Sequence, residues 1–79
     1  MGRRALAVQM GQRLRHFRLA AGWSMGNVEA HSGVPKARQS RYENGHVLPD
    51  LNTLDKLAAF YGCSISDLVR GIGTNGKVD

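Results

Sequence analysis

Glycines divide this chain into short segments, and this division constrains the fold more than any other feature. Gly22, Gly33, Gly45 and Gly62 each follow a stretch whose composition suits a helix. Glycine ends helices readily because it adopts the left-handed backbone conformation at little cost. No strand-like alternation of apolar and polar residues accompanies these stretches. The pattern therefore predicts an all-α fold of five short helices joined by tight turns.

Residues that begin helices stand where this division requires them. Ser, Asp and Pro are favoured at helix starts, because a side-chain oxygen accepts an otherwise unpaired amide hydrogen and Pro has none to pair. Such residues are Ser24, Pro35, Asp50 and the capping-box pair Ser64 and Asp67. The third helix should then run from Lys36 to about Asn44.

Apolar residues recur at three- and four-residue spacing, which predicts one buried stripe per helix. The first helix carries Met10, Leu14, Phe17 and Ala21; the fourth carries Leu51, Leu54, Leu57, Ala58 and Tyr61; the fifth carries Ile65, Leu68, Val69 and Ile72. Trp23 is expected to pack beside the turn. The fifth stripe exceeds what a small core needs, so we expect it to form a dimer interface.

Size and composition exclude several classes of protein. A chain of 79 residues provides one domain, and its apolar runs are far shorter than a membrane span or a secretory signal core. We expect a cytoplasmic location. Cys63 is the one cysteine, and the three histidines lie far apart in the sequence, so neither a disulfide nor a metal site is expected. No arrangement of nucleophile and base suggests an enzyme, a cofactor or a small-molecule substrate.

The positive charge lies in one half of the chain. The net charge is +5, and residues 1–46 contain eight of the 11 Lys and Arg but two of the six Asp and Glu. A basic surface of this kind attracts nucleic acid. A solvated basic surface without a partner is the alternative that charge alone leaves open.

Residues 24–45 form a helix, a glycine turn and a second helix. The segment resembles the helix-turn-helix of the Cro and lambda-repressor-like (XRE-type) family, and the likeness extends from about Met10 to Val69. The resemblance implies a compact five-helix DNA-binding domain over residues 9–72, with the helix-turn-helix formed by helices 2 and 3. Residues 1–8 would be a basic arm and the start of helix 1, and residues 73–79 a flexible tail.

The resemblance also implies which residues contact DNA. Helix 3 would enter the major groove and contact bases through Lys36, Ala37, Ser40 and Arg41. Phosphates would be bound by Ser24, Met25, Arg38, Asn44, His46 and Arg18, with Arg3 and Arg4 in the arm. Arg18 would in addition form a structural ion pair with Glu43. At each position solvated surface is the alternative, and a base-contacting residue could instead contact a phosphate.

The sequence departs from the family pattern at several positions. Met25 replaces the usual glutamine, and Pro35 replaces the usual serine cap. Glu29 and Gln39 replace an alanine and a branched aliphatic residue that face each other across the turn. Because a buried unpaired polar group is destabilising, we expect the two to share a hydrogen bond. An exposed ion pair between Glu29 and Arg38 is the alternative.

These features together predict a sequence-specific DNA-binding transcriptional regulator. We expect a repressor or autoregulator that binds a short palindromic operator in double-stranded DNA as a homodimer, because one helix contacts only a few base pairs. The alternative is a protein-interaction adaptor or an antitoxin-like module that uses the same fold to bind a protein partner.

Overall fold

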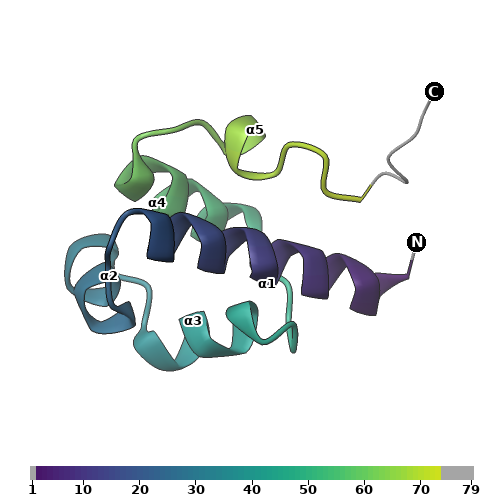
Figure 1. Ribbon diagram of the computed structural model, residues 1–79, viewed down its shortest axis with the longest axis horizontal. Coiled ribbons are helices and arrows are strands. Elements are labelled where there is room, and N and C mark those ends of the chain that lie inside the picture. The colour runs from purple at the N-terminus through teal and green to yellow at the C-terminus, as the bar shows by residue number, and fades with distance from the viewer. Residues whose placement is uncertain (1, 74–79) are drawn as a thin grey trace.

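The computed structural model describes residues 2–73. They form five α-helices and, within this range, no strand: α1 (Arg3–Ala20), α2 (Met25–Ser32), α3 (Lys36–Glu43), α4 (Leu51–Tyr61) and α5 (Ile65–Leu68). In Figure 1, α1 crosses the middle of the molecule, with α3 on one side and α4 and α5 on the other. The predicted all-α, five-helix architecture is confirmed.

The predicted helix starts and ends are present in the structure. The Ser24 hydroxyl accepts a hydrogen bond from the Asn27 amide at 3.1 Å, and the Asp50 carboxylate accepts one from the Thr53 amide at 2.8 Å. Ser64 and Asp67 form the expected capping box. Gly33 and Gly62 end α2 and α4 in the left-handed conformation, at φ of 82° and 75°. Local sequence signals therefore set these boundaries.

A single apolar core joins the helices. Its buried members are Met10, Leu14, Val28, Val34, Tyr42, Leu54, Leu57, Ala58 and Leu68. Trp23 packs at the edge, with its ring 5.2 Å from that of Phe60 and 5.3 Å from that of His31. Two expectations are wrong. Ala21 is exposed, because it follows α1 as its C-cap. Leu51 is 72% exposed, because it lies in the first turn of α4 and faces away from the core. Thr53 is buried from that turn instead.

The C-terminal segment lies back along α1. Arg13 donates hydrogen bonds to the carbonyls of Leu68 and Arg70 at 3.1 and 2.8 Å, and the Gly73 amide donates to Gln9 Oε1 at 3.1 Å. Figure 1 shows this segment running alongside α1 beyond α5. It is therefore part of the domain through residue 73; the rest of the expected tail, residues 74–79, lies outside the described residues.

This packing corrects the expected dimer stripe. The fifth helix ends at Leu68, so Ile72 lies in the turns that follow it. Leu68 is fully buried, and the other three members of the stripe, Ile65, Val69 and Ile72, pack partly buried against the core. The stripe is apolar because the short α5 and the following turns must cover the core of their own domain.

The expected N-terminal arm is also different in the structure. Arg3 and Arg4 are the first two residues of α1, so they extend from a helix and not from an unstructured segment. Ala7, one turn later, is 5% exposed, which ties this first part of α1 to the domain. Among residues 2–73, no helix is long and apolar enough to cross a membrane.

Candidate nucleic-acid interface

Helix α3 has two distinct faces. Gln39 and Tyr42, three residues apart, are buried at 4% and 5% exposure. The residues predicted to contact bases lie on the remaining surface, since Lys36, Ala37 and Arg41 are exposed and Ser40 is half-buried. The three-residue spacing of the buried pair places both on one side of the helix. The helix therefore packs by one face and presents a basic, solvent-accessible face.

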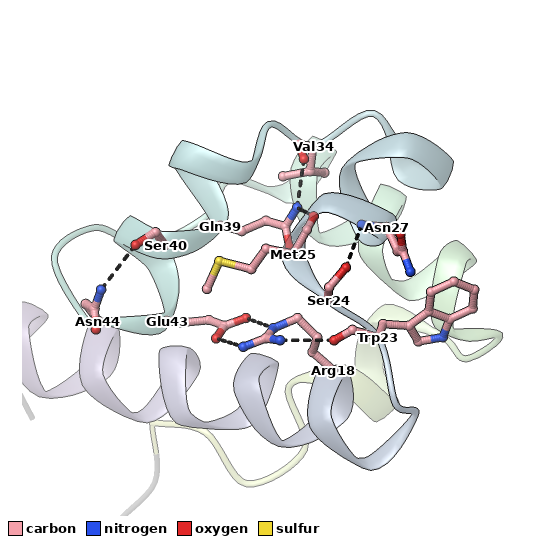
Figure 2. Close-up of polar contacts among 10 residues, drawn as sticks. All are labelled: Arg18, Trp23, Ser24, Met25, Asn27, Val34, Gln39, Ser40, Glu43 and Asn44. Carbon is pink, nitrogen blue, oxygen red and sulfur yellow. Dashed lines mark hydrogen bonds and ion pairs between the residues drawn. The ribbon is translucent and has the colours of Figure 1, made fainter.

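A buried ion pair holds the C-terminal end of α3 against α1. Arg18 Nε and Nη2 donate to the two carboxylate oxygens of Glu43 at 2.7 and 2.9 Å, and Arg18 Nη1 donates to the Trp23 carbonyl at 3.0 Å. The side chains are 11% and 4% exposed. The hydrogen bond to Glu43 raises the pKa of Arg18. Figure 2 shows that one guanidinium thereby joins α1, α3 and the loop before α2, at Trp23.

Close backbone contact between α1 and α3 was not anticipated from the sequence. A Cβ atom added at Gly11 would lie 2.2 Å from the Tyr42 carbonyl oxygen, a separation that real side chains do not permit. Gly11 thus lets the end of α3 reach the surface of α1. The available signal was a glycine inside a helix, which is unfavourable by about 1 kcal/mol relative to alanine and so suggests a packing role.

Gln39 holds the start of α3 to the start of α2. Its side-chain amide donates to the Met25 carbonyl at 3.0 Å and to the Val34 carbonyl at 2.9 Å, as Figure 2 shows. The Val34 carbonyl lies in the loop before α3, and its bond to Gln39 is buried, so Gln39 supplies a donor to a backbone group outside the helices. A polar residue is therefore accommodated where the family pattern has an aliphatic one.

Glu29 does not pair with Gln39, and it does not pair with Arg38. Its Oε1 accepts a hydrogen bond from the Lys36 amide at 3.1 Å. The first amides of a helix have no partner within the helix, and Pro35 offers no side-chain oxygen to accept one. Glu29 thus supplies, from α2, the negative cap that α3 lacks locally. Both expectations for Glu29 are wrong for this reason.

The residues expected to bind phosphate lie in different environments. The Ser24 hydroxyl is engaged in capping α2, and in Figure 2 the Met25 side chain extends towards Gln39 and Glu43. Asn44 is the C-cap of α3 and donates to the Ser40 hydroxyl at 3.3 Å. Arg38 and His46 are exposed. The first amides of a helix have no partner within the helix. In α2 the Asn27 amide is taken by Ser24, and the amides before it suit an anion.

Two further side chains of the domain have raised pKa values. Burial raises the pKa of Tyr61 to about 12, and Glu43 contributes in the same direction. Burial also raises the pKa of the Cys63 thiol, which disfavours its reactive thiolate form. Within residues 2–73, no three His, Cys, Asp or Glu side chains gather closely enough to hold a metal ion.

The sequence is similar to those of known proteins. The helix-turn-helix domain family matches residues 9–70. The chain is 34% identical over 61 residues to the SPbeta prophage-derived uncharacterized HTH-type transcriptional regulator YonR of Bacillus subtilis (strain 168), covering 77% of this chain and 56% of that protein. It is 36% identical over 63 residues to the cryptic phage CTXphi transcriptional repressor RstR of Vibrio cholerae, covering 80% and 57%. The chain thus spans little more than half of each relative.

One solved structure has the same fold, and the likeness extends over nearly the whole length of that protein. The restriction-modification controller protein C.AhdI from Aeromonas hydrophila superposes with a TM-score of 0.74 at 31% sequence identity, over 78% of this chain and 94% of that one. The family match covers both helices of the helix-turn-helix, the ion pair between α1 and α3, and all of α4 and α5. The chain belongs to the helix-turn-helix domain family, and its fold is of the Cro and lambda-repressor type.

Proposed function

We propose that this chain is a DNA-binding transcriptional regulator, a repressor or autoregulator, that inserts α3 into the major groove of a short palindromic operator. One observation carries the proposal: α3 is fixed on its inner side by Gln39 and by the Arg18–Glu43 ion pair, and its outer side is basic and accessible. A helix held in one orientation can place side chains in register with base edges. The similarity to a phage repressor and a prophage regulator supports the regulatory role.

Base contacts come from the outer side of α3 in this proposal. Arg41 makes the principal contact, because a guanidinium can donate two hydrogen bonds to O6 and N7 of guanine. Lys36 donates to an acceptor nearby, and the Ala37 methyl rests on a thymine methyl. The Ser40 hydroxyl already accepts from Asn44, which orients it to donate to a base.

Phosphate contacts surround this face. The amides at the start of α2, around Ser24 and Met25, bind one phosphate through the positive end of the helix dipole. Met25 contributes only its backbone, since its side chain is half-buried. Arg38, Asn44 and His46 bind further phosphates. Arg18 uses three N–H groups within the protein, so any phosphate contact it makes uses the remaining ones.

The proposed DNA-bound form is a homodimer. A palindromic site presents the same bases twice, so two copies related by a dyad double the contacts. With Leu68 buried, the contact between copies uses the accessible edges of Ile65, Val69 and Ile72. Sedimentation with and without the selected operator measures this directly. Monomers alone at micromolar concentration, in both conditions, would refute the dimer.

Selection of bound sequences from a random duplex pool tests the function as a whole. We expect enrichment of two half-sites related by a dyad. Arg41→Ala should lose about 1–3 kcal/mol of discrimination at one base pair per half-site, a 5- to 150-fold change by order of magnitude. Arg70→Ala removes an exposed arginine near α5 and should leave the selected sequence unchanged. Failure of the unmodified chain to enrich any duplex would reject the function.

A further inference from the structure

Glu29 is the one exposed carboxylate in the basic half of the chain. Residues 1–46 contain two acidic residues, Glu29 and Glu43. Glu43 is buried and paired with Arg18, whereas Glu29 is exposed. Neither ion pair found within residues 2–73 involves Glu29. A negative charge that no ion pair neutralises therefore lies in the half of the domain that is proposed to bind a polyanion.

The Glu29 side chain reaches from α2 to the first turn of α3. Its Oε1 accepts a hydrogen bond from the Lys36 amide at 3.1 Å, and Lys36 is the first residue of α3. Glu29, Lys36 and the following Ala37 are all exposed. In a helix-turn-helix, the N-terminal residues of the inserted helix contact base edges. The carboxylate is thus fixed at the end of α3 that the proposed function brings to the bases.

The second carboxylate oxygen of Glu29 is available to a ligand. Within residues 2–73, the hydrogen bond that the carboxylate accepts uses Oε1 and leaves Oε2 without a donor. An ionised carboxylate oxygen only accepts hydrogen bonds, so Oε2 selects for a ligand that donates one. Gln39 fixes the loop before α3 through the Val34 carbonyl at 2.9 Å, so the carboxylate and the start of α3 keep their relative position.

Capping alone does not account for a charged group at this position. The family pattern caps the third helix with a serine, whose neutral oxygen accepts a first-turn amide hydrogen, and this chain has Pro35 there. A serine would cap the helix without repelling phosphates. The Glu29 carboxylate weakens the electrostatic attraction between the domain and DNA. A contact that needs a negatively charged acceptor would offset this loss.

Cytosine is the base whose major-groove edge suits Glu29 Oε2. It presents the N4 amino group as a donor and no acceptor, whereas guanine and thymine present acceptors that repel a carboxylate, and adenine presents an acceptor beside its donor. The guanine paired with that cytosine offers O6 and N7 to a cation. The Lys36 ammonium belongs to neither ion pair of the described residues. One acceptor and one donor at the start of α3 thus match the two halves of a C·G pair.

We propose that Glu29 is a specificity-determining residue that contacts a base from α2: its Oε2 accepts a hydrogen bond from cytosine N4, and the Lys36 ammonium donates to the guanine of the same pair. This inference rests on the proposed DNA-binding function and extends it, because the base contacts proposed above all come from α3. Glu29 selects against thymine at this position, since thymine O4 occupies the place of cytosine N4. The cap and the base contact use different oxygens of one carboxylate.

Selection from a random duplex pool with Glu29→Gln tests the contact. The unmodified chain should favour cytosine over thymine by about 5-fold or more at one base pair per half-site, other than the pair that responds to Arg41→Ala. Glutamine retains the cap through its carbonyl oxygen and presents an amide donor in place of Oε2. The preference should therefore reverse to thymine. Asp55→Asn, which removes an exposed carboxylate from α4, should leave the selected sequence unchanged.

A second variant separates the base contact from capping. Glu29→Ala combined with Pro35→Ser removes the carboxylate and supplies a serine cap within α3 itself. Its selected sequences, measured on folded protein at low temperature, should lack the preference for cytosine. Recovery of that preference in the combined variant would show that Glu29 acts only as a cap, and would overturn the contact.

The outcomes distinguish this inference from the function on which it rests. Identical base preferences in the unmodified chain and in Glu29→Gln, with an operator enriched by both, would overturn the Glu29 contact alone. Failure of the unmodified chain to enrich any duplex would overturn both. Lys36→Met should weaken the preference at the same base pair that responds to Glu29→Gln. An effect of Lys36→Met confined to a different pair would overturn the shared C·G contact.

Discussion

Helices α3 and α4 are held in the domain by different forces. Helix α4 buries four residues, Thr53, Leu54, Leu57 and Ala58, and is anchored by apolar contact. Helix α3 buries Gln39 and Tyr42 and is anchored largely by directional bonds that reach three other parts of the chain. Apolar contact keeps a helix in the core, but it is non-directional and so specifies the orientation of the helix weakly. Hydrogen bonds form only within a small range of distances and angles, so they specify orientation more closely. The helix proposed to contact bases is the one with the more closely specified orientation.

The largest effect is expected from the ion pair. Arg18→Met leaves the Glu43 carboxylate buried without its partner, which should lower the free energy of unfolding by about 4 kcal/mol. Affinity for the selected operator should fall as well, since α3 loses its attachment to α1. Thermal unfolding and a DNA titration measure the two effects. Arg18→Met combined with Glu43→Met should recover stability; if it is no more stable than Arg18→Met, the buried charge is not the cause.

For α4, which is anchored by apolar contact, Leu57→Ala should lower the free energy of unfolding by about 3 kcal/mol. Leu57 is 3% exposed, so its truncation leaves a cavity in the core. The comparison predicts that DNA affinity, corrected for the folded fraction, stays nearly constant. Denaturant unfolding and a titration at low temperature give both values. A large loss of affinity in fully folded Leu57→Ala protein would mean that α4 orients α3 as strongly as the polar contacts do.

Gln39→Ile should lower the free energy of unfolding by about 2 kcal/mol, since two backbone carbonyls lose their donor. Glu29→Ala should have a smaller effect through the amide of Lys36. Because the two side chains contact different groups, a double-mutant cycle should give a coupling below about 0.5 kcal/mol. A coupling well above this value would indicate direct contact between Glu29 and Gln39.

The smallest effects should appear only at extremes of pH. Hydrogen bonds from the Thr53 and Ser64 amides lower the pKa of Asp50 and Asp67, respectively. The two ionised carboxylates therefore stabilise the folded protein fully at pH values above the usual carboxyl range. This stabilisation is lost as the pH falls through the lowered pKa. Tyr61 acts in the opposite range: its pKa is raised to about 12, so stability falls as pH rises from about 10 towards 12.

Melting temperatures at a series of pH values measure both trends. Asp50→Asn should flatten the acid side of the profile, and Tyr61→Phe should flatten the alkaline side. If the melting temperature of Tyr61→Phe fell at alkaline pH as much as that of the unmodified chain, the alkaline loss of stability would belong to groups other than Tyr61.

The ends of helices were predictable because their causes are local. Ser24, Asp50 and Ser64 each accept an amide hydrogen from three residues ahead, so the sequence contains both partners of each bond within one turn. The charge imbalance of residues 1–46 is likewise a property of the sequence. The pairing of Arg18 with Glu43 came from the resemblance to the family and not from spacing, because 25 residues separate the two.

Other features depended on contacts between distant segments. Leu51 fits the apolar spacing of α4 but lies where no other helix covers it. The sequence also suggested that Leu68 was available to a partner, although the turns around α5 bury it in their own domain. Spacing shows which residues share a face, but not which faces are covered.

The sequence by itself determined the number and order of the helices, most of their ends and the half of the chain that carries the positive charge. Only the tertiary structure decided that Glu29 caps α3, that Gln39 joins α2 to the loop before α3, and that Arg3 and Arg4 extend from a helix beside His46. The physical reason is range. Capping and periodicity involve residues within about one turn, whereas the partner of a polar side chain depends on which segments the whole core brings together.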